Sequence, residues 1–365
     1  MRKRPLIWAA AAVLVTAGGA FFAIRRADRR ADRAAPGQIP LAVLGDSDSH
    51  SYRDTLAGIR RGGDYHAVTY QWTEILAALR PRSIDQGPME AFGTRYRFAA
   101  AKSLLGMATK TPRKEDFRYN YSVSGLGADS LREAWPKQAK WLTAELNQRP
   151  NFWRNGVVVI RIGINDVGQE EKLLQYARQG IDEAARDAIR ACTDRISNAA
   201  LAVTSAHDSV RVVLVGIADN SLFAAPESEI FHVPEGAARI HAALDLFDSR
   251  LKETAAAHPR VVFMNDRAWI ERYRDATSQT GGILFADRFQ VSFTRGDHPK
   301  NAALSDGHAG TIINGLWARE LIRLLNRETA AEIPEIRDEE IARLADPSGV
   351  FGISPLSHTE AENTQ

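Results

Sequence analysis

Ser47 lies between two aspartates, directly after an apolar run that ends at Leu44. A serine hydroxyl is a weak nucleophile unless a base takes its proton, and it attacks best from an exposed turn. A parallel strand that runs into a helix N-terminus supplies such a turn, together with backbone N–H groups for an oxyanion. By itself, however, the tripeptide Gly-Asp-Ser is more simply explained as a helix cap.

Three later blocks favour chemistry over capping, because of their order along the chain. The blocks are NYSVSGLG, VVVIRIGIND and SDGHAGT. They place Gly125 at the end of one expected strand and Asn165 at the end of the next, with Asp306 and His308 just before the last expected helix. Each block is short, so the signal lies in their order and placement. In these respects the chain resembles the SGNH/GDSL hydrolases over about residues 41 to 326.

The resemblance implies a role for each matching residue. Ser47 would be the nucleophile, and its N–H would form an oxyanion hole with the Gly125 N–H and the Asn165 side-chain amide. Loss of one such donor typically costs about a hundredfold or more in rate. His308 would act as general base and then as general acid, with Asp306 orienting its imidazole.

The acid block departs from the family pattern, in which the Asp usually precedes the His by three residues. Asp306 precedes His308 by two, and Ser305 stands where the acid is expected. A backbone carbonyl or another acid is therefore an alternative orienting group. His298, which follows Asp297, is a rival base. We favour His308 because a Gly-Thr pair and the closing helix follow it directly.

Other chemistry-bearing residues receive structural interpretations. We expect Cys192 to be a small buried side chain, His50 to lie at the surface and Asp166 to cap the helix that follows it. Ser130 occupies the third glycine position of a dinucleotide fingerprint, which argues against a nucleotide cofactor. No metal motif is present, so we expect no metal or cofactor. Four tryptophans are interpreted as packing residues rather than sugar-stacking platforms: Trp72, Trp135, Trp141 and Trp153.

Strand-like and helix-like runs alternate along the body of the chain. The expected strands are 41–44, 65–70, 119–123, 157–162, 210–215 and 261–264. The expected helices are 74–79, 137–146, 181–206, 237–257 and 312–326. This alternation predicts an α/β fold, a three-layer α/β/α sandwich with a parallel sheet of about five strands, as in the flavodoxin-like SGNH hydrolases. Two long insertions, 81–117 and 266–305, interrupt it.

The N-terminus predicts a membrane segment. Basic residues precede an uncharged run from Pro5 to Ile24, and Arg25 closes it. A bilayer needs about 20 mostly apolar residues, and a cleaved signal usually has a shorter apolar core. We therefore expect an uncleaved anchor, although the small residues at 18–20 leave cleavage open. The expected organisation is an anchor at 1–24, a linker at 25–40, the hydrolase-like domain at 41–330 and a tail at 331–365.

Composition narrows the function further. The chain has 47 Lys and Arg residues and 45 Asp and Glu residues, a net charge of +2. So small a positive charge argues against a nucleic acid partner. The expected function is ester hydrolysis outside the cytoplasm, in the periplasm or extracellularly, on a small-molecule or polysaccharide ester, with O-acetyl groups of envelope polysaccharide favoured. The alternatives are a non-catalytic glycan-binding or scaffold protein and an acyltransferase of the same fold.

Overall fold

The computed structural model describes residues 33–95, 98, 101–102, 110–224, 228–274, 281–287 and 289–353. The expected membrane anchor at residues 1–24 lies outside the described residues. In the part of the chain that is described, no helix has the length and apolar character needed to cross a bilayer.

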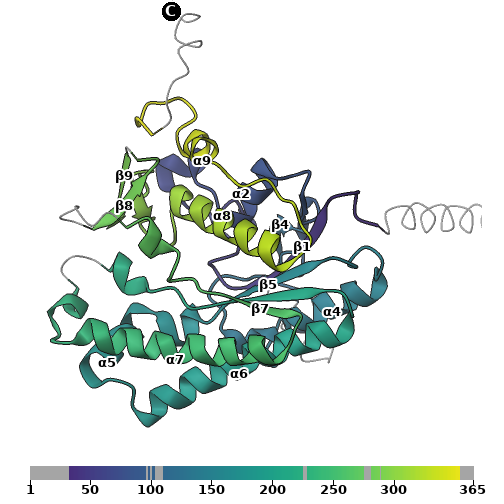
Figure 1. Cartoon of the computed structure of the whole chain (residues 1–365), viewed down its shortest axis with the longest axis horizontal. Coiled ribbons are helices and arrows are strands. Elements are labelled where there is room, and N and C mark those ends of the chain that lie inside the picture. Colours follow the sequence, from purple (N-terminus) through teal and green to yellow (C-terminus); the bar gives the residue numbers. More distant parts are fainter. Residues whose placement is uncertain are drawn as a thin grey trace, which may run out of the picture.

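A five-stranded sheet with the order β2-β1-β5-β6-β7 forms the centre of the molecule (Figure 1). All four neighbouring pairs are parallel. Every residue of β1 is buried, as a strand covered on both faces requires. The strands are β1 (Ile39–Gly45), β2 (Ile84–Asp85), β5 (Val157–Arg161), β6 (Arg211–Val215) and β7 (Val261–Met264). The predicted fold class is confirmed.

Two helical layers cover the sheet, and successive residues of β1 alternate between them. Ala42 and Leu44 enter one apolar core, whereas Leu41 and Val43 enter the other. The first layer contains α4 (Gln138–Gln148), α5 (Glu170–Gln179), α6 (Glu183–Ala206) and α7 (Gly236–Ala257). The second layer contains α2 (Trp72–Leu79), α8 (Thr311–Glu328) and α9 (Asp338–Ala345).

The two long insertions carry small sheets of their own. In the first, β3 (Met89–Phe92) pairs antiparallel with β4 (Lys114–Phe117). The second contains β8 (Gly282–Phe285), β9 (Phe289–Arg295) and β10 (Asn301–Ala303), in the order β10-β9-β8. Short 3-10 helices span Gly63–Val68, Ala128–Leu131, Asn220–Phe223, Glu229–His232 and Ile270–Arg272, and a π-helical turn spans Ile164–Gly168.

Two expected strands differ from the structure. Residues 65–70 belong mainly to a 3-10 helix with no buried residue, so they lack the side-chain burial that a central strand needs. Residues 119–123 form no strand: a turn ends at Tyr119, and Asn120 makes an isolated bridge to β1. The Tyr121 N–H donates to the Val43 carbonyl at 2.8 Å. This stretch therefore continues along the edge of β1 that the short β2 leaves open.

Two helices were not expected from the sequence. Helix α5 precedes α6 and buries Leu173, Tyr176 and Ala177, which recur at helical spacing. Helix α9 lies in the segment expected as a tail and packs against α8. Gly315 of α8 permits the close approach, since a Cβ there would come within 2.7 Å of the Ile341 side chain. Residues 338–345 therefore belong to the folded body.

Candidate active site

Ser47 lies in a tight turn at the carboxyl end of β1, here named the serine turn (residues 46–50). The Asp46 carboxylate accepts the Asp48 N–H at 3.0 Å, and the Asp46 carbonyl accepts the His50 N–H at 3.1 Å. No helix follows directly, so the expected helix N-terminus is a turn instead. Within the described residues, neither the hydroxyl nor the N–H of Ser47 makes a hydrogen bond. Both groups are therefore free for chemistry.

Side chains from three other segments fix the backbone of the serine turn. The Gln138 amide bonds both backbone groups of Gly45, accepting its N–H at 2.8 Å and donating to its carbonyl at 2.9 Å. The Asp48 carbonyl accepts from Trp72 at 3.0 Å and from Arg161 at 3.1 Å. A Cβ at Gly45 would lie 2.6 Å from the Arg161 carbonyl. The turn is thus rigid and requires glycine at its entrance.

Gly125 lies beside this turn with a free amide. The Val123 N–H donates to the Gly45 carbonyl at 3.1 Å, which brings the two loops together. Residues 123–126 form a turn in which Gly125 has φ +80°, a conformation that favours glycine. A Cβ on Gly125 would meet nothing within 4 Å. Gly125 is exposed and its N–H has no partner among the described residues, so this N–H is available as an oxyanion donor.

Asn165 is tied to the same loop. Its amide nitrogen donates to the Leu126 carbonyl at 2.9 Å, and its amide oxygen accepts from Gln169 at 3.1 Å. A side-chain amide has two N–H groups, so one remains for a ligand. The sequence predicted that the neighbouring Asp166 would cap the helix that follows it, and this prediction is wrong. It accepts the Ala128 N–H at 2.9 Å and so holds the far end of the Gly125 loop.

Asp306 reaches His308 despite the shortened spacing. Nδ1 of His308 lies 3.0 Å from Oδ1 of Asp306. Gly307, with φ +85°, lets the chain fold back, and the Leu304 N–H closes the loop on the His308 carbonyl at 2.7 Å. Partial burial raises the pKa of Asp306, but its contacts with His308 and the Arg61 charge outweigh this and hold the pKa below its usual value.

Arg61 occupies the other side of the imidazole. Its Nε donates to Asp306 at 2.8 Å, and its Nη2 lies 3.2 Å from Nε2 of His308. A guanidinium only donates, so Nε2 accepts and the ring proton of a neutral imidazole sits on Nδ1. Nδ1 is close to Asp306, but the pair lacks the alignment of a hydrogen bond. This is the tautomer a general base needs. Among the described residues, however, His308 makes no hydrogen bond to Ser47 in this arrangement.

The rival base His298 and its neighbour Asp297 make structural contacts. The His298 ring contacts Tyr65 and Phe351, with both centroid distances at 5.1 Å. Asp297 accepts the Ser305 N–H at 3.0 Å and its hydroxyl at 2.8 Å. Asp297 therefore holds the start of the loop that carries Asp306.

A small cavity of about 50 Å³ adjoins the serine turn. Asp48 lines it from the serine turn, and Gly307 and Ala309 line it from either side of His308. The Arg161 guanidinium forms part of the wall and pairs with Asp266 at 3.1 Å. Among the described residues, no group of three or more His, Cys, Asp or Glu side chains is arranged to hold a metal ion.

The prediction that His50 lies at the surface is wrong. His50 is only 1% exposed, and it contacts Ser124 and Asp54. The His-x-x-x-Asp spacing was the available signal. Cys192 is buried, as predicted. Trp72 and Trp153 are fully buried, which confirms packing roles for these two.

No protein-family model matches the chain, and no curated protein matches it. Solved structures do match. The extracellular lipase of Streptomyces rimosus is 16% identical with a TM-score of 0.37, and the alignment covers 64% of this chain and 83% of the lipase. The acetylxylan esterase Axe2 of Geobacillus stearothermophilus is 13% identical with a TM-score of 0.37, covering 79% and 94%.

A third similar structure is a family 3 carbohydrate esterase of Clostridium thermocellum. It is 17% identical with a TM-score of 0.37, and the alignment covers 81% of this chain and 100% of the esterase. All three proteins are ester hydrolases by description, the class that the four sequence blocks resemble. At such identities and TM-scores, function has to be inferred from the residues of the site itself.

Proposed function

We propose that this protein is a serine ester hydrolase that acts through an acyl-Ser47 intermediate. The observation that carries the proposal is the convergence of three elements at one edge of the sheet. These are a rigid turn with a free serine hydroxyl, an adjacent free glycine amide, and a histidine whose Nδ1 lies 3.0 Å from the Asp306 carboxylate. Together they provide a nucleophile, an oxyanion donor and a base.

In the proposed reaction the Ser47 hydroxyl attacks the ester carbonyl carbon and its proton passes to Nε2 of His308. The negative charge that develops on the carbonyl oxygen is bound by the N–H groups of Ser47 and Gly125 and by the free amide hydrogen of Asn165. Nε2 then protonates the leaving alcohol. Water attacks the acyl-serine with His308 again as base, releasing the acid. Arg61 must withdraw from Nε2 before the first step, because the Nε2 lone pair cannot accept from the Arg61 guanidinium and from the Ser47 hydroxyl at the same time.

The substrate class of the proposal depends on location, because the cavity of about 50 Å³ beside the serine turn is lined by neither Ser47 nor His308. We favour O-acetyl groups that are carried by an envelope or extracellular polysaccharide. That location depends on the N-terminal apolar segment acting as an anchor or export signal.

A fluorophosphonate probe tests the proposal directly on the soluble body, residues 36–365. We expect labelling at Ser47, located by peptide mass spectrometry, and loss of p-nitrophenyl acetate hydrolysis in Ser47→Ala with an unchanged thermal midpoint. Since Ser47 caps no helix, removing its hydroxyl leaves stability unaltered. A Ser47→Ala variant that keeps full esterase activity would overturn the proposal.

The contact of Arg61 with Nε2 favours one alternative, a non-catalytic protein of the same fold that binds glycans. In that case the guanidinium would hold the base permanently. The discriminating result is a folded protein that takes up no probe and hydrolyses no ester but is retained by a glycan resin.

A further inference from the structure

Ser124 has the arrangement of an activated serine, and it precedes Gly125 directly. Its hydroxyl lies 3.0 Å from Nδ1 of His50, and Nε2 of His50 lies 2.8 Å from Asp54. Among the residues that the structure describes, Ser124 is the one serine whose hydroxyl is hydrogen-bonded to a histidine ring. We propose that Ser124 is a second nucleophilic serine of this site, with His50 as its base and Asp54 as the orienting carboxylate.

The hydrogen bonds fix the ring tautomer that this role requires. The Ser124 backbone N–H also donates to Nδ1 of His50, at 3.2 Å. Nδ1 is therefore an acceptor, so the ring proton lies on Nε2 and points to Asp54. The Ser124 hydroxyl and the Ser124 backbone N–H share the single Nδ1 lone pair, so the backbone N–H must turn away before Nδ1 takes the hydroxyl proton. Compared with the usual triad the two ring nitrogens have exchanged roles, but each makes the contact that base catalysis needs.

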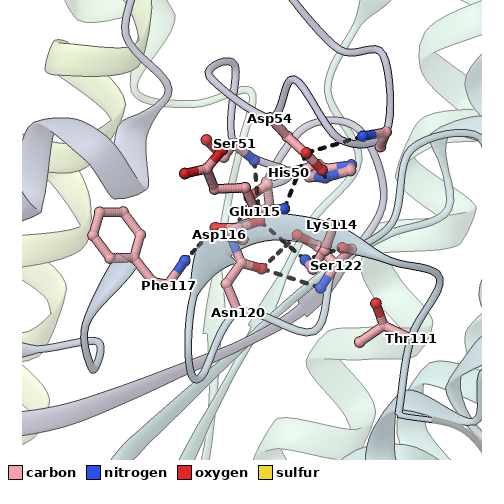
Figure 2. Close-up of polar contacts among 12 residues, drawn as sticks. His50, Ser51, Asp54, Thr111, Lys114, Glu115, Asp116, Phe117, Asn120 and Ser122 are labelled. Carbon is pink, nitrogen blue, oxygen red and sulfur yellow. Dashed lines mark hydrogen bonds and ion pairs between the residues drawn. The ribbon is translucent and has the colours of Figure 1, made fainter. Parts of the chain in front are cut away.

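Asp54 is held as an ionised carboxylate by the first insertion and by its own loop. One oxygen accepts the backbone N–H groups of Leu56 at 2.9 Å, Ala57 at 3.0 Å and Glu115 at 3.0 Å. The other faces His50, and Figure 2 shows this pair beside β4. Burial raises the pKa of Asp54, but the hydrogen bonds from His50 and the backbone lower it by more. The net pKa therefore lies below the ordinary value of an aspartate.

His50 is kept neutral, as a base must be. Burial lowers the pKa of His50, and the positive charge of Lys114 lowers it further. Lys114 is itself completely buried beneath the serine turn, where it donates to Asp116 at 3.0 Å and to the Ser122 carbonyl at 2.6 Å (Figure 2). The first insertion thus supplies both the anchor for Asp54 and the charge that favours a neutral imidazole.

Ser124 lies at a partly exposed position beside Gly125, which is exposed and borders open space. The free Gly125 N–H follows the serine directly, which is where an oxyanion donor stands after many catalytic serines. A small ester that enters this space therefore meets an activated hydroxyl and an oxyanion donor.

The proposed step is balanced within the site. The Ser124 oxygen forms a bond to the carbonyl carbon of a small ester while its proton moves to Nδ1 of His50. The resulting imidazolium lies between Ser124 and Asp54. The carbon–oxygen bond of the ester then breaks, and the leaving alcohol takes the proton back from Nδ1. Water hydrolyses the acyl-Ser124 by the same route and releases the acid.

The test is fluorophosphonate labelling of Ser47→Ala, with the labelled residue found by peptide mass spectrometry. We expect residual labelling at Ser124 that disappears in Ser47→Ala/Ser124→Ala. Ser47→Ala/Ser249→Ala is the matched control, because the Ser249 hydroxyl on α7 contacts only a main-chain carbonyl. That double variant keeps the label.

Asp54→Asn in the Ser47→Ala background separates activation from mere positioning. Asparagine keeps an oxygen for the three backbone N–H groups, but its NH₂ faces Nε2 and moves the ring proton to Nδ1. We expect labelling of Ser124 to slow by about a hundredfold, at a thermal midpoint close to that of Ser47→Ala.

Two results would overturn the inference. In the first, folded Ser47→Ala takes up no probe although the unaltered chain is labelled at Ser47, so His50 only clamps the loop. In the second, Ser124 is labelled equally fast with Asp54→Asn. The proposal for Ser47 is judged separately, by labelling of the unaltered chain at Ser47 itself.

Discussion

One glycine decides the geometry of the proposed acid–base pair. Asp306 and His308 are separated by Gly307 alone, and its positive φ folds the chain back so that carboxylate and ring meet at 3.0 Å. An L-residue with a side chain would be strained in that conformation. A spacing that departs from the family pattern is thus compatible with an oriented base.

The variant Asp306→Asn tests the orienting role of this carboxylate at the level of one atom. The introduced side-chain amide would donate to Nδ1 of His308 and shift the ring proton to Nε2, the nitrogen that must accept from Ser47. We expect kcat for p-nitrophenyl acetate to fall by about a thousandfold or more, with little change in KM. The counterpart Asp297→Asn leaves kcat largely intact if His308 is the base. Loss of activity in Asp297→Asn alone would move that role to His298.

Arg61 is the residue that controls access to the base in this structure. Its guanidinium donates to Nε2 of His308, and a hydrogen bond of this kind is worth about 1.5–3 kcal/mol. Arg61→Met removes the donor, so we expect fluorophosphonate labelling of Ser47 to accelerate by about tenfold.

Arg53→Met is the matched control for that variant. Arg61 lies over the Tyr52 ring at 5.0 Å, and Arg53 lies over the Tyr70 ring at 4.4 Å. Among the described residues, Arg53 has no contact with His308. Its removal is expected to leave the labelling rate unchanged. Slower labelling of Arg61→Met would show instead that Arg61 positions Asp306 for the reaction.

At the scale of elements, the first insertion and the loop after β10 support the proposed site, and the last helix is tied to the second helical layer. Strand β4 holds Asp54 through the Glu115 N–H, and the loop after β10 carries His308. Helix α9 is joined to the end of α2 by Arg80, which donates to both oxygens of Glu340 at 2.9 Å.

The Arg80–Glu340 pair gives a pH-dependent stability. Hydrogen bonding to Arg80 lowers the pKa of Glu340 from 4.5 to about 2. A depressed carboxyl pKa stabilises the fold fully above the unfolded value, and the contribution is lost as pH falls through the folded value. Glu340→Gln should therefore lower the free energy of unfolding by about 2 kcal/mol near neutral pH.

Urea unfolding at several pH values measures this effect. The gap between the unaltered chain and Glu340→Gln should narrow as pH falls from about 4.5 towards 2. Asp187→Asn is the control, because Asp187 belongs to an exposed pair with Arg190 and should change little at any pH. A gap that stays constant with pH would mean that the charge of Glu340 adds no stability.

At the scale of the molecule, four separate segments deliver the proposed site to one edge of a parallel sheet. The carboxyl ends of β1 and β5 carry Ser47 and Asn165, and the loops around Gly125 and His308 lie alongside. In open α/β sheets this edge is where ligands bind, because the strand ends and loops leave a crevice there.

The proposed anchor at residues 1–24 is a prediction about the whole chain. Its uncharged run between basic flanks has the length of a membrane span, so we expect the full chain to remain in membranes through salt and carbonate washes. The body that begins at residue 36 should be released into the soluble fraction. A mature protein that begins at Phe21 and washes off would show a cleaved export signal instead.

The sequence by itself determined most of the layered fold. Strands buried on both faces leave continuous runs of Val, Ile and Leu, and helices leave apolar residues at three- and four-residue spacing, so both are visible locally. It failed at residues 65–70, where positions 65–68 belong to an unburied 3-10 helix, and at 119–123, where only an isolated bridge to β1 forms.

The sequence also determined which residue types stand in the order of a serine hydrolase, because that information is contained in short blocks. Only the tertiary structure decided what faces each functional group. Arg61 approaches Asp306 and His308 from about 250 positions away, and His50 meets Ser124 across 74. Such pairings follow from how distant loops pack on the sheet, and the packing depends on the whole chain at once, so no local pattern records it.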